Sequence, residues 1–290
     1  MIMQKINVVF SLLLITCSLF FSTAYAKDYI FNKDVSFDTT TKIMSDKNKT
    51  PVTGAVKRYY NDGKLEMTGT FIEGLAQGET KGYYESGQVC YVTPYRDGVL
   101  DGTAKYYSQQ GKLAEERTYM YGLLEGKAKK YYPDGKLMAE ATYKDDQLEG
   151  IQITYGPDGK TTSQIPYSGG KINGMATRFY DTGAIMSEIP YVDDKPDGFA
   201  KIYYKSSKTY AEYFYKAGKL SGDVKIYEED TGSYLEFIYK DDIAVKGWFV
   251  TKDGKKKTLK KKQLETWNNS GKIEGYENIT KGILSVRDAD

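Results

Sequence analysis

This 290-residue sequence contains no histidine. Carboxylates, tyrosines and lysines are therefore the side chains that remain for chemistry. Glutamate recurs at multiples of 24 residues, at Glu116, Glu140, Glu188, Glu212 and Glu236. On a sheet, copies in neighbouring hairpins would lie about 10 Å apart, across two strand spacings. That distance resembles the separation of the two carboxylates in an inverting glycosidase. A ladder of identical residues is more typical of a solvated sheet face, so we expect no catalytic residue and no enzyme.

The sequence lacks the residues that other common catalytic, metal and phosphate-binding sites require. Without histidine there is no Ser-His-Asp or Cys-His arrangement and no histidine metal site. Of the two cysteines, Cys17 lies in the apolar N-terminal segment, and Cys90 alone cannot build a thiolate metal site. No G-x-x-x-x-G-K-[ST] loop stands between a strand and a helix, since the Gly-Lys pairs fall in predicted turns. We therefore expect no cofactor and no bound metal.

The strongest pattern in the chain is a 24-residue period of glycines. These glycines are Gly54, Gly78, Gly102, Gly126, Gly150, Gly174, Gly198 and Gly222. Counting each as position 1, position 6 is aromatic in all eight copies: Tyr59, Tyr83, Tyr107, Tyr131, Tyr155, Phe179, Tyr203 and Tyr227. Position 18 is also always aromatic: Phe71, Tyr95, Tyr119, Tyr143, Tyr167, Tyr191, Tyr215 and Tyr239. Such columns indicate one small structural unit copied in tandem.

Each repeat has room for two strands and two turns. In the copy from Gly126 to Glu149, two segments rich in strand formers flank Pro133-Asp134-Gly135, a strong turn signal. The repeat is too short for a strand–helix–strand crossover, which needs about 30 residues. The sequence therefore predicts an all-β fold: an elongated, single-layer antiparallel β-meander of tandem 24-residue β-hairpin repeats, with about sixteen strands.

Side-chain alternation predicts how each hairpin is paired. A three-residue loop with a left-handed glycine pairs position 6 with position 12. Position 18 would then share their face, so that Tyr131, Leu137 and Tyr143 gather on one side. Lysine at position 4, as in Lys105 and Lys129, would lie on that face too. The glutamates at position 15 and the tyrosines at position 7 would lie on the opposite face.

The tyrosines at position 7 are the candidate binding residues: Tyr60, Tyr84, Tyr132, Tyr180 and Tyr204. An exposed stripe of aromatic rings could contact a protein or a glycan. The alternative is cross-strand packing that stiffens a one-layer sheet. Both interpretations place the tyrosines in one row.

The segments that flank the repeats are expected to act as caps. Residues 27–53 form the predicted N-terminal β cap, where Tyr29-Ile30-Phe31 and Val35-Ser36-Phe37 could add a hairpin. The eight repeats span residues 54–246. Residues 247–290 contain a partial repeat and a C-terminal cap. Within that cap, residues 258–268 could form a short helix in which Leu259, Leu264 and Trp267 pack on the last strand.

Residues 1–26 resemble an export signal. Lys5 precedes an apolar run of about 14 residues, shorter than a membrane span, and Ala24 and Ala26 are the small residues that signal peptidase requires. We expect cleavage after Ala26 and a protein in the periplasm, on the cell surface or secreted. A lipoprotein modified at Cys17 and an uncleaved anchor are the alternatives.

The charge balance limits the partners. The chain has 41 basic and 39 acidic residues, so a field that attracts nucleic acid is not expected. The segment Lys252–Lys262 contains seven lysines and one acidic residue. A solvated cap explains this segment, and an anionic partner such as a cell-surface polymer or a membrane surface is the alternative.

The repeat pattern G-x-x-x-x-Y-Y-x-x-x-G-K-L…Y-x-x-G-x-L-x-G resembles the MORN repeat variant, and in bacteria the antitoxin-like repeat proteins of YwqK type. The resemblance covers Thr53 to about Gly247. It implies an all-β scaffold for protein contacts, which in some members neutralises a toxin, while some eukaryotic relatives associate with membranes. We therefore expect an exported, non-enzymatic scaffold for protein–protein interaction, with an immunity-type role as its finer form. The alternative is a cell-envelope protein that binds cell-wall glycan through the tyrosine stripe.

Overall fold

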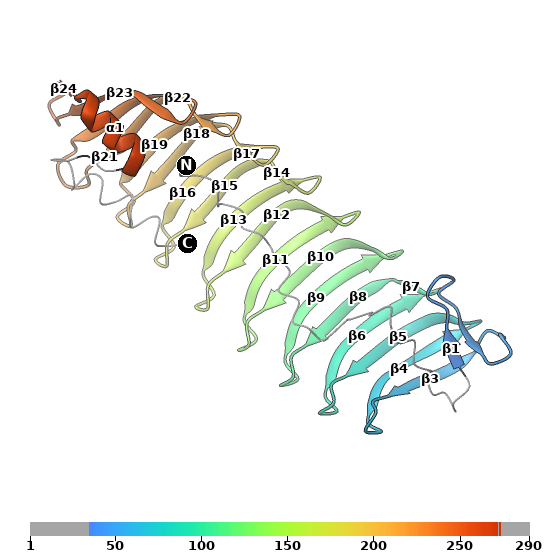
Figure 1. Ribbon diagram of the computed structural model, residues 1–290. Helices are drawn as coiled ribbons and strands as arrows, with labels where there is room; N and C mark the ends of the chain where they lie inside the picture. The colour runs from blue at the N-terminus through green and yellow to red at the C-terminus, as the bar shows by residue number, and fades with distance from the viewer. Residues whose placement is uncertain (1–34, 272, 274–290) are drawn as a thin grey trace. The chain divides into compact units, whose positions relative to one another are not determined.

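The computed structural model describes residues 35–271 and 273, and over these residues the chain forms 24 strands and one helix (Figure 1). The first half contains β1 (Val35–Phe37), β2 (Met44–Asp46), β3 (Gly54–Tyr59), β4 (Leu65–Ile72), β5 (Leu75–Tyr83), β6 (Val89–Arg96), β7 (Val99–Leu100), β8 (Gly102–Tyr107), β9 (Leu113–Met120), β10 (Leu123–Tyr131) and β11 (Leu137–Lys144). The second half contains β12 (Gln147–Tyr155), β13 (Thr161–Ser168), β14 (Lys171–Ile172), β15 (Gly174–Phe179), β16 (Ile185–Val192), β17 (Lys195–Pro196), β18 (Gly198–Tyr203), β19 (Thr209–Lys216), β20 (Lys219–Leu220), β21 (Gly222–Tyr227), β22 (Tyr234–Lys240), β23 (Ile243–Val250), β24 (Lys256–Thr258) and α1 (Lys261–Ser270).

The chain divides into two units. Unit 1 runs to Leu137 and includes Tyr143–Asp146, whereas unit 2 takes Met138–Thr142 and the chain from Gln147 onward. Within each unit, successive strands pair antiparallel with their neighbours in chain order (Figure 1). The prediction of an all-β antiparallel meander with a short C-terminal helix is confirmed.

Each hairpin closes around a left-handed residue, as predicted. In the first repeat Tyr59 pairs with Leu65, which are positions 6 and 12. The loop is held by the amide of Tyr60, which donates to the carbonyl of Lys64 at 2.8 Å. Gly63 takes φ +86° between them, a conformation that costs glycine little. Ser207 occupies the same place in the seventh repeat, with φ +67°.

A β-bulge follows the turn in six of the repeats and changes the face of every later side chain. In the first repeat Arg58 pairs with Met67, one residue further than the Tyr59–Leu65 pairing allows, so Glu66 has no partner opposite. The second, third, fifth, sixth and seventh repeats have the same shift. Positions 6 and 18 consequently lie on opposite faces.

The predicted grouping of Tyr131 with Tyr143 is therefore wrong. The Tyr131 hydroxyl donates to the carboxylate of Glu116 at 2.7 Å. Tyr143 instead lies near Arg117, whose charge acts on its hydroxyl while burial raises the pKa of Tyr143. Glu116 and Arg117 are consecutive residues of β9, and consecutive side chains of a strand point to opposite faces. We call the face of Tyr143 the core face and that of Tyr131 the outer face.

The core face carries the buried residues of both units. Its position 3 side chains are small and almost fully covered: Val56 (0%), Ala104 (0%), Ala200 (1%) and Val224 (1%). In unit 2 Val224 joins a cluster that includes Tyr210, Ile226, Leu235 and Phe237. The apolar area that this cluster removes from water is the main stabilising term of unit 2.

Helix α1 covers the C-terminal end of that cluster, close to the predicted residues 258–268. The Trp267 indole stacks on Phe237 with ring centroids 4.6 Å apart, and its Nε1 donates to the Tyr239 hydroxyl at 2.6 Å. Leu259 is 5% exposed and Leu264 packs against the cluster. The predicted short helix is present and its Trp267 packs on β22, while its role as a cap stays a prediction. Gly271 ends the helix with φ +65°.

The described part of the predicted N-terminal cap of unit 1 contains a hairpin. Val35–Phe37 pairs with Met44–Asp46. Tyr29–Phe31, the export signal and Cys17 lie outside the described residues. The hairpin packs with Val56 and Phe71 in a second buried cluster. Within the part of the chain that the structure describes, no helix has the length and apolar character of a membrane span.

The period of glycines at position 1 has a geometric cause. Gly174 adopts φ +115°, and a Cβ there would lie 3.0 Å from Cγ of Pro166. Gly198 shows the same relation to Pro190, at φ +114° and 3.1 Å. Side chains at position 17 thus press on the glycine that begins the following repeat, so both the backbone conformation and the space favour glycine.

Candidate binding surfaces

Tyrosine–glutamate hydrogen bonds join successive repeats on the outer face. The hydroxyl at position 6 donates to the glutamate fifteen residues earlier, at position 15 of the preceding repeat. The four pairs are Tyr131–Glu116 (2.7 Å), Tyr155–Glu140 (2.6 Å), Tyr203–Glu188 (2.7 Å) and Tyr227–Glu212 (2.9 Å). Glu236 accepts from the Lys256 ammonium instead, at 2.5 Å. The periodic glutamates therefore have a structural partner each.

Lysines alternate with these glutamates across the strands of unit 2. Lys201 stands opposite Glu188 on one side and Glu212 on the other, and Lys225 stands between Glu212 and Glu236. The Lys201 Nζ is 3.5 Å from a Glu212 carboxylate oxygen. Position 4 thus shares the outer face with position 6, as predicted. These pairs are partly exposed, so each contributes little to stability.

The predicted tyrosine stripe lies on the core face and is half-buried. Its hydroxyls donate to the backbone carbonyl of the position 6 residue in the next repeat, in the pairs Tyr60–Tyr83 (2.6 Å), Tyr84–Tyr107 (2.6 Å), Tyr180–Tyr203 (2.7 Å) and Tyr204–Tyr227 (2.7 Å). Tyr132, the remaining member, is half-buried as well. Burial raises the pKa of Tyr204 to about 12, and its ring packs edge-on against Tyr210. These tyrosines link one repeat to the next, and their role as a contact surface stays a prediction.

An exposed apolar row, which sequence reasoning missed, lies on the outer face of unit 2. Its first members occupy position 2 of the fifth to seventh repeats: Ile151, Met175 and Phe199, with exposures of 57%, 48% and 72%. Directly opposite them at position 17 stand Pro166, Pro190 and Phe214. The rings of Phe199 and Phe214 are 4.8 Å apart. We call these six residues the apolar ladder.

The apolar ladder is local to unit 2. In the first four repeats position 2 is Ala55, Glu79, Thr103 and Lys127. A contiguous exposed apolar row, unlike a lone exposed side chain, marks an interaction surface. The signal in the sequence was this change at position 2, which the invariant columns at positions 6 and 18 obscured.

Unit 1 has its own exposed apolar residues, at the turns between repeats. They are Ile72 (49%), Val99 (42%), Met120 (49%), Tyr121 (71%) and Leu123 (43%). Each of these turns is tight, and Tyr121 adopts φ +51°. In unit 2 the position of Val99 and Leu123 is held by Lys171, Lys195 and Lys219. Unit 2 also has exposed apolar turn residues, Val192 (51%) and Ile243 (57%), so an apolar turn edge is not particular to unit 1.

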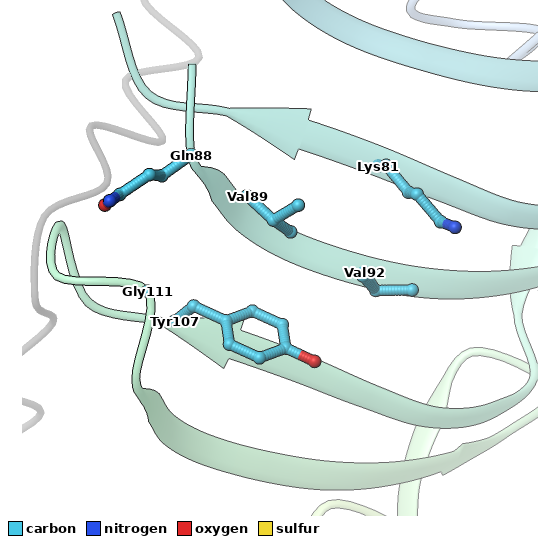
Figure 2. Close-up of a pocket in the computed structure, with 6 residues that line it drawn as sticks. All are labelled: Lys81, Gln88, Val89, Val92, Tyr107 and Gly111. Carbon is cyan, nitrogen blue, oxygen red and sulfur yellow. The ribbon is translucent and has the colours of Figure 1, made fainter. Parts of the chain in front are cut away.

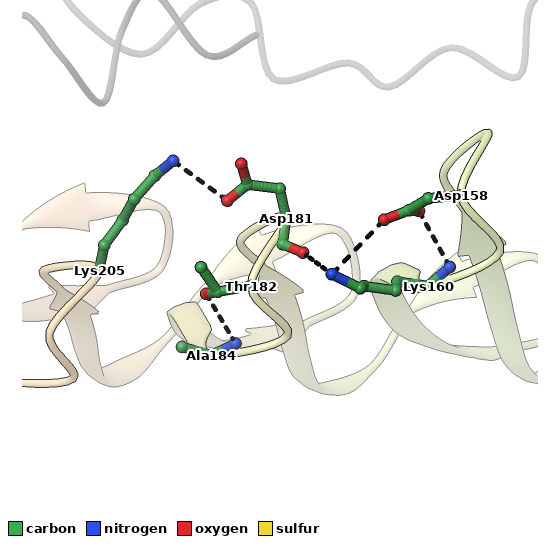
Figure 3. A network of polar contacts seen from close by, with 6 residues as sticks. All are labelled: Asp158, Lys160, Asp181, Thr182, Ala184 and Lys205. Carbon is green, nitrogen blue, oxygen red and sulfur yellow. Dashed lines mark hydrogen bonds and ion pairs between the residues drawn. The ribbon is translucent and has the colours of Figure 1, made fainter.

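Exposed ion pairs join the hairpin turns of unit 2 at the other edge of the sheet (Figure 3). The Lys160 ammonium donates to the backbone carbonyl of Asp181 at 2.5 Å, and the Lys205 ammonium donates to the Asp181 carboxylate at 3.1 Å. The hydrogen bond from Lys205 lowers the pKa of Asp181. The pairs are solvated, so we assign them a role in aligning the turns rather than a binding role.

The sequence of the repeats matches a known family. The MORN repeat variant matches residues 52–73, 76–97, 100–120, 124–145 and 172–193. These segments belong to the MORN repeat variant family. The repeats that begin at Gly150, Gly198 and Gly222 follow the same 24-residue period but are not matched by the family model. Those at Gly150 and Gly198 keep the same hairpin register. The apolar ladder lies partly in these unmatched repeats, because Ile151 and Phe199 begin two of them.

Other comparisons add nothing on function. No curated protein sequence matches the chain. Among solved structures, selenomethionine-substituted virginiamycin B lyase from Staphylococcus aureus is similar at 12% identity over 71% of this chain and 84% of the other, with a TM-score of 0.17. At that score the likeness carries no argument about this MORN-repeat protein.

The basic segment after the MORN repeats forms β24 and the start of α1. Lys256 bonds Glu236 and lies over the Trp248 ring at 5.5 Å. Lys255 pairs with Asp253 at 2.9 Å while 82% of its side chain stays exposed. Lysines on the last strand discourage pairing with other chains. Among the described residues, no group of three or more Asp, Glu, Cys or His side chains could hold a metal ion.

Proposed function

We propose that this chain is an exported, non-enzymatic MORN-repeat scaffold that binds another protein through the apolar ladder of unit 2. The observation that carries the proposal is Phe199, which is 72% exposed while its ring packs on Phe214. Aromatic residues and methionine are enriched where proteins meet. The repeat family is consistent with protein or membrane binding.

The lysine and glutamate row beside the ladder suits a protein partner. Alternating charges at Lys201, Glu212 and Lys225 frame the apolar row with a polar rim. Interfaces between proteins have this arrangement of an apolar centre and a charged rim. The finer form of the proposal is an immunity-type role, in which the partner is a toxin.

A pull-down with mass spectrometry tests the apolar ladder. The variant Ile151→Ser/Met175→Ser/Phe199→Ser should fold normally by circular dichroism, because its side chains are exposed, and should lose the partner. The matched control, Glu79→Ser/Thr103→Ser/Lys127→Ser, changes the residues at position 2 in unit 1. This variant should still capture the partner. The partner found is then purified and titrated against both variants. Equal affinity of the two variants would refute the proposal.

The alternative is binding of cell-wall glycan, with the position 7 tyrosines in contact. Titration with cell-wall fragments would quench the aromatic fluorescence of the wild-type protein. The variant Tyr84→Phe/Tyr180→Phe/Tyr204→Phe keeps the rings, so glycan stacking on them would survive. Quenching in the wild type that the ladder variant also shows would favour the glycan over the protein partner.

Export is tested separately on protein from the native host. We propose cleavage after Ala26, so mass spectrometry should find Lys27 as the first residue. A mature chain that begins at a lipid-modified Cys17 would replace the proposal of a soluble exported protein with that of a lipoprotein.

A further inference from the structure

The outer face of unit 1 has a hollow of about 370 Å³. It is lined by Lys81, Gln88, Val89, Val92, Tyr107 and Gly111 (Figure 2). These residues come from β5, the turn and strand that follow it, and the hairpin that begins with β8. In Figure 2 the Lys81 amine and the Tyr107 hydroxyl extend on the same side of the sheet as Val92.

The other repeats show which group belongs beside such a tyrosine. Tyr131, Tyr155, Tyr203 and Tyr227 each donate to a glutamate fifteen residues earlier, at 2.6–2.9 Å. Tyr107 has the same place in its repeat, but the residue fifteen positions earlier is Val92. Among the described residues, no side chain accepts a hydrogen bond from the Tyr107 hydroxyl. The chain itself therefore shows that a carboxylate fits this geometry, and supplies none here.

Lysines flank Val92 as they flank the glutamates. Val92 stands opposite Lys81 on β5 and Lys105 on β8. Glu116 stands between Lys105 and Lys129 in the same way. Lys81 contacts Glu79 at 3.3 Å, but both side chains are largely exposed, so water screens that pair.

The arrangement of lysines without a glutamate between them continues toward the N-terminus. In the first repeat, position 15 is Thr68, which stands between Lys57 and Lys81. Three consecutive lysines at position 4 thus have no glutamate between them on the outer face. Thr68 and Val92 therefore each lie between two lysines without a carboxylate at their own position, whereas lysine and glutamate alternate on the outer face of unit 2.

We propose that this hollow binds the carboxylate of an aspartate or glutamate side chain from a partner protein. The carboxylate accepts the Tyr107 O–H and lies between the Lys81 and Lys105 ammonium groups, in charge-assisted contacts. The methyl groups of Val89 and Val92 pack against the methylene groups of the incoming side chain. A row of three lysines favours an acidic segment over a single acidic residue. The site lies in unit 1 and does not depend on the apolar ladder.

Fluorescence anisotropy with fluorescein-labelled hexaglutamate at low salt tests the site without the natural partner. Wild-type protein should bind the peptide saturably. Val92→Glu supplies the carboxylate from within, so affinity should fall about tenfold or more. Val92→Gln is the matched control, because it fills the same space without charge and has a natural precedent in Gln164 at this position. The affinity of Val92→Gln for hexaglutamate should fall by less than about threefold.

Two further variants separate this site from a general attraction to lysine. Tyr107→Phe removes only the hydroxyl and should weaken hexaglutamate binding about threefold or more. Glu116→Val removes the carboxylate between Lys105 and Lys129. The affinity for hexaglutamate should therefore increase. Thermal melts confirm that each variant is folded.

Equal affinities of wild type and Val92→Glu would overturn the proposal, as would equal losses in Val92→Glu and Val92→Gln. A second titration uses galacturonate oligomers, whose carboxylates come from a polysaccharide. If these oligomers bind and hexaglutamate does not, the proposal that the carboxylate belongs to a protein is wrong. A failed pull-down through the apolar ladder leaves this experiment unaffected, so the two proposals fail separately.

Discussion

The hydroxyl of Tyr155 donates a 2.6 Å hydrogen bond to the carboxylate of Glu140, fifteen residues earlier in the chain. The bond fixes positions 6 and 15 of successive repeats on one face of the sheet. In four pairs of successive repeats the later repeat supplies the hydroxyl donor and the earlier repeat supplies the carboxylate acceptor, which explains why glutamate recurs at position 15. A glutamate whose spacing resembles that of a catalytic carboxylate thus connects one repeat to the next.

The Tyr155–Glu140 pair predicts a loss of stability at high pH. The hydrogen bond to Glu140 raises the pKa of Tyr155 to about 12, above its value of about 10 in the unfolded chain. A folded-state pKa above the unfolded value means that the stabilisation is complete below pH 10 and is lost as the pH rises toward 12. Urea melts should therefore show midpoints that fall between pH 10 and 12. The fall should be smaller in Glu140→Gln, and an identical pH profile in that variant would argue against the coupling.

Glycine at position 1 predicts a difference between two alanine variants. Gly174→Ala must place a Cβ 3.0 Å from Pro166 at φ +115°. Gly159→Ala in a hairpin turn has φ +82° but no atom within 4 Å of the new Cβ. The turn variant should cost about 1–2 kcal/mol from backbone conformation alone. The Gly174 variant should cost about 1–3 kcal/mol more, because it also overpacks. Equal costs in urea unfolding would show that Pro166 moves freely.

The repeat-linking tyrosines should stabilise the fold through their hydroxyls. Tyr84→Phe removes the 2.6 Å bond to the Tyr107 carbonyl and leaves the ring in place. The free energy of unfolding should fall by about 0.5–1.5 kcal/mol. Tyr121→Phe is the control, since that side chain is 71% exposed at a turn and should have no measurable effect. If the two variants unfold alike, the hydroxyls at position 7 have no structural role.

The period of glycines and aromatic residues was enough to predict the hairpins, their turn type and the pairing of Tyr59 with Leu65. It could not reveal the bulge, because position 13 holds residues as different as Glu66, Cys90 and Tyr210. One extra residue reverses the face of everything after it, so a correct turn still gave a wrong face for Tyr143. The small residues at position 3, such as Ala104 and Ala200, were the available signal for the buried face.

The sequence predicted that a row of side chains on one sheet face could bind a partner, but it did not predict which residues are exposed there. The tyrosines at position 7 form a row, but their acceptors are backbone carbonyls, which no sequence pattern displays. The apolar ladder depends on which residues oppose each other across β18 and β19, as Phe199 and Phe214 do. That pairing follows from the register after the bulge. A surface that depends on the register of two strands therefore requires the structure.

Photo-crosslinking from the outer face tests most directly whether the apolar ladder binds a partner protein. With benzoylphenylalanine at position 199, in the apolar ladder, the protein should crosslink to one partner that mass spectrometry identifies. The same group at position 103, which is Thr103 at the equivalent place in unit 1, should give no such product. Crosslinking to that partner from position 103 and not from position 199 would contradict the assignment of the apolar ladder as the binding surface.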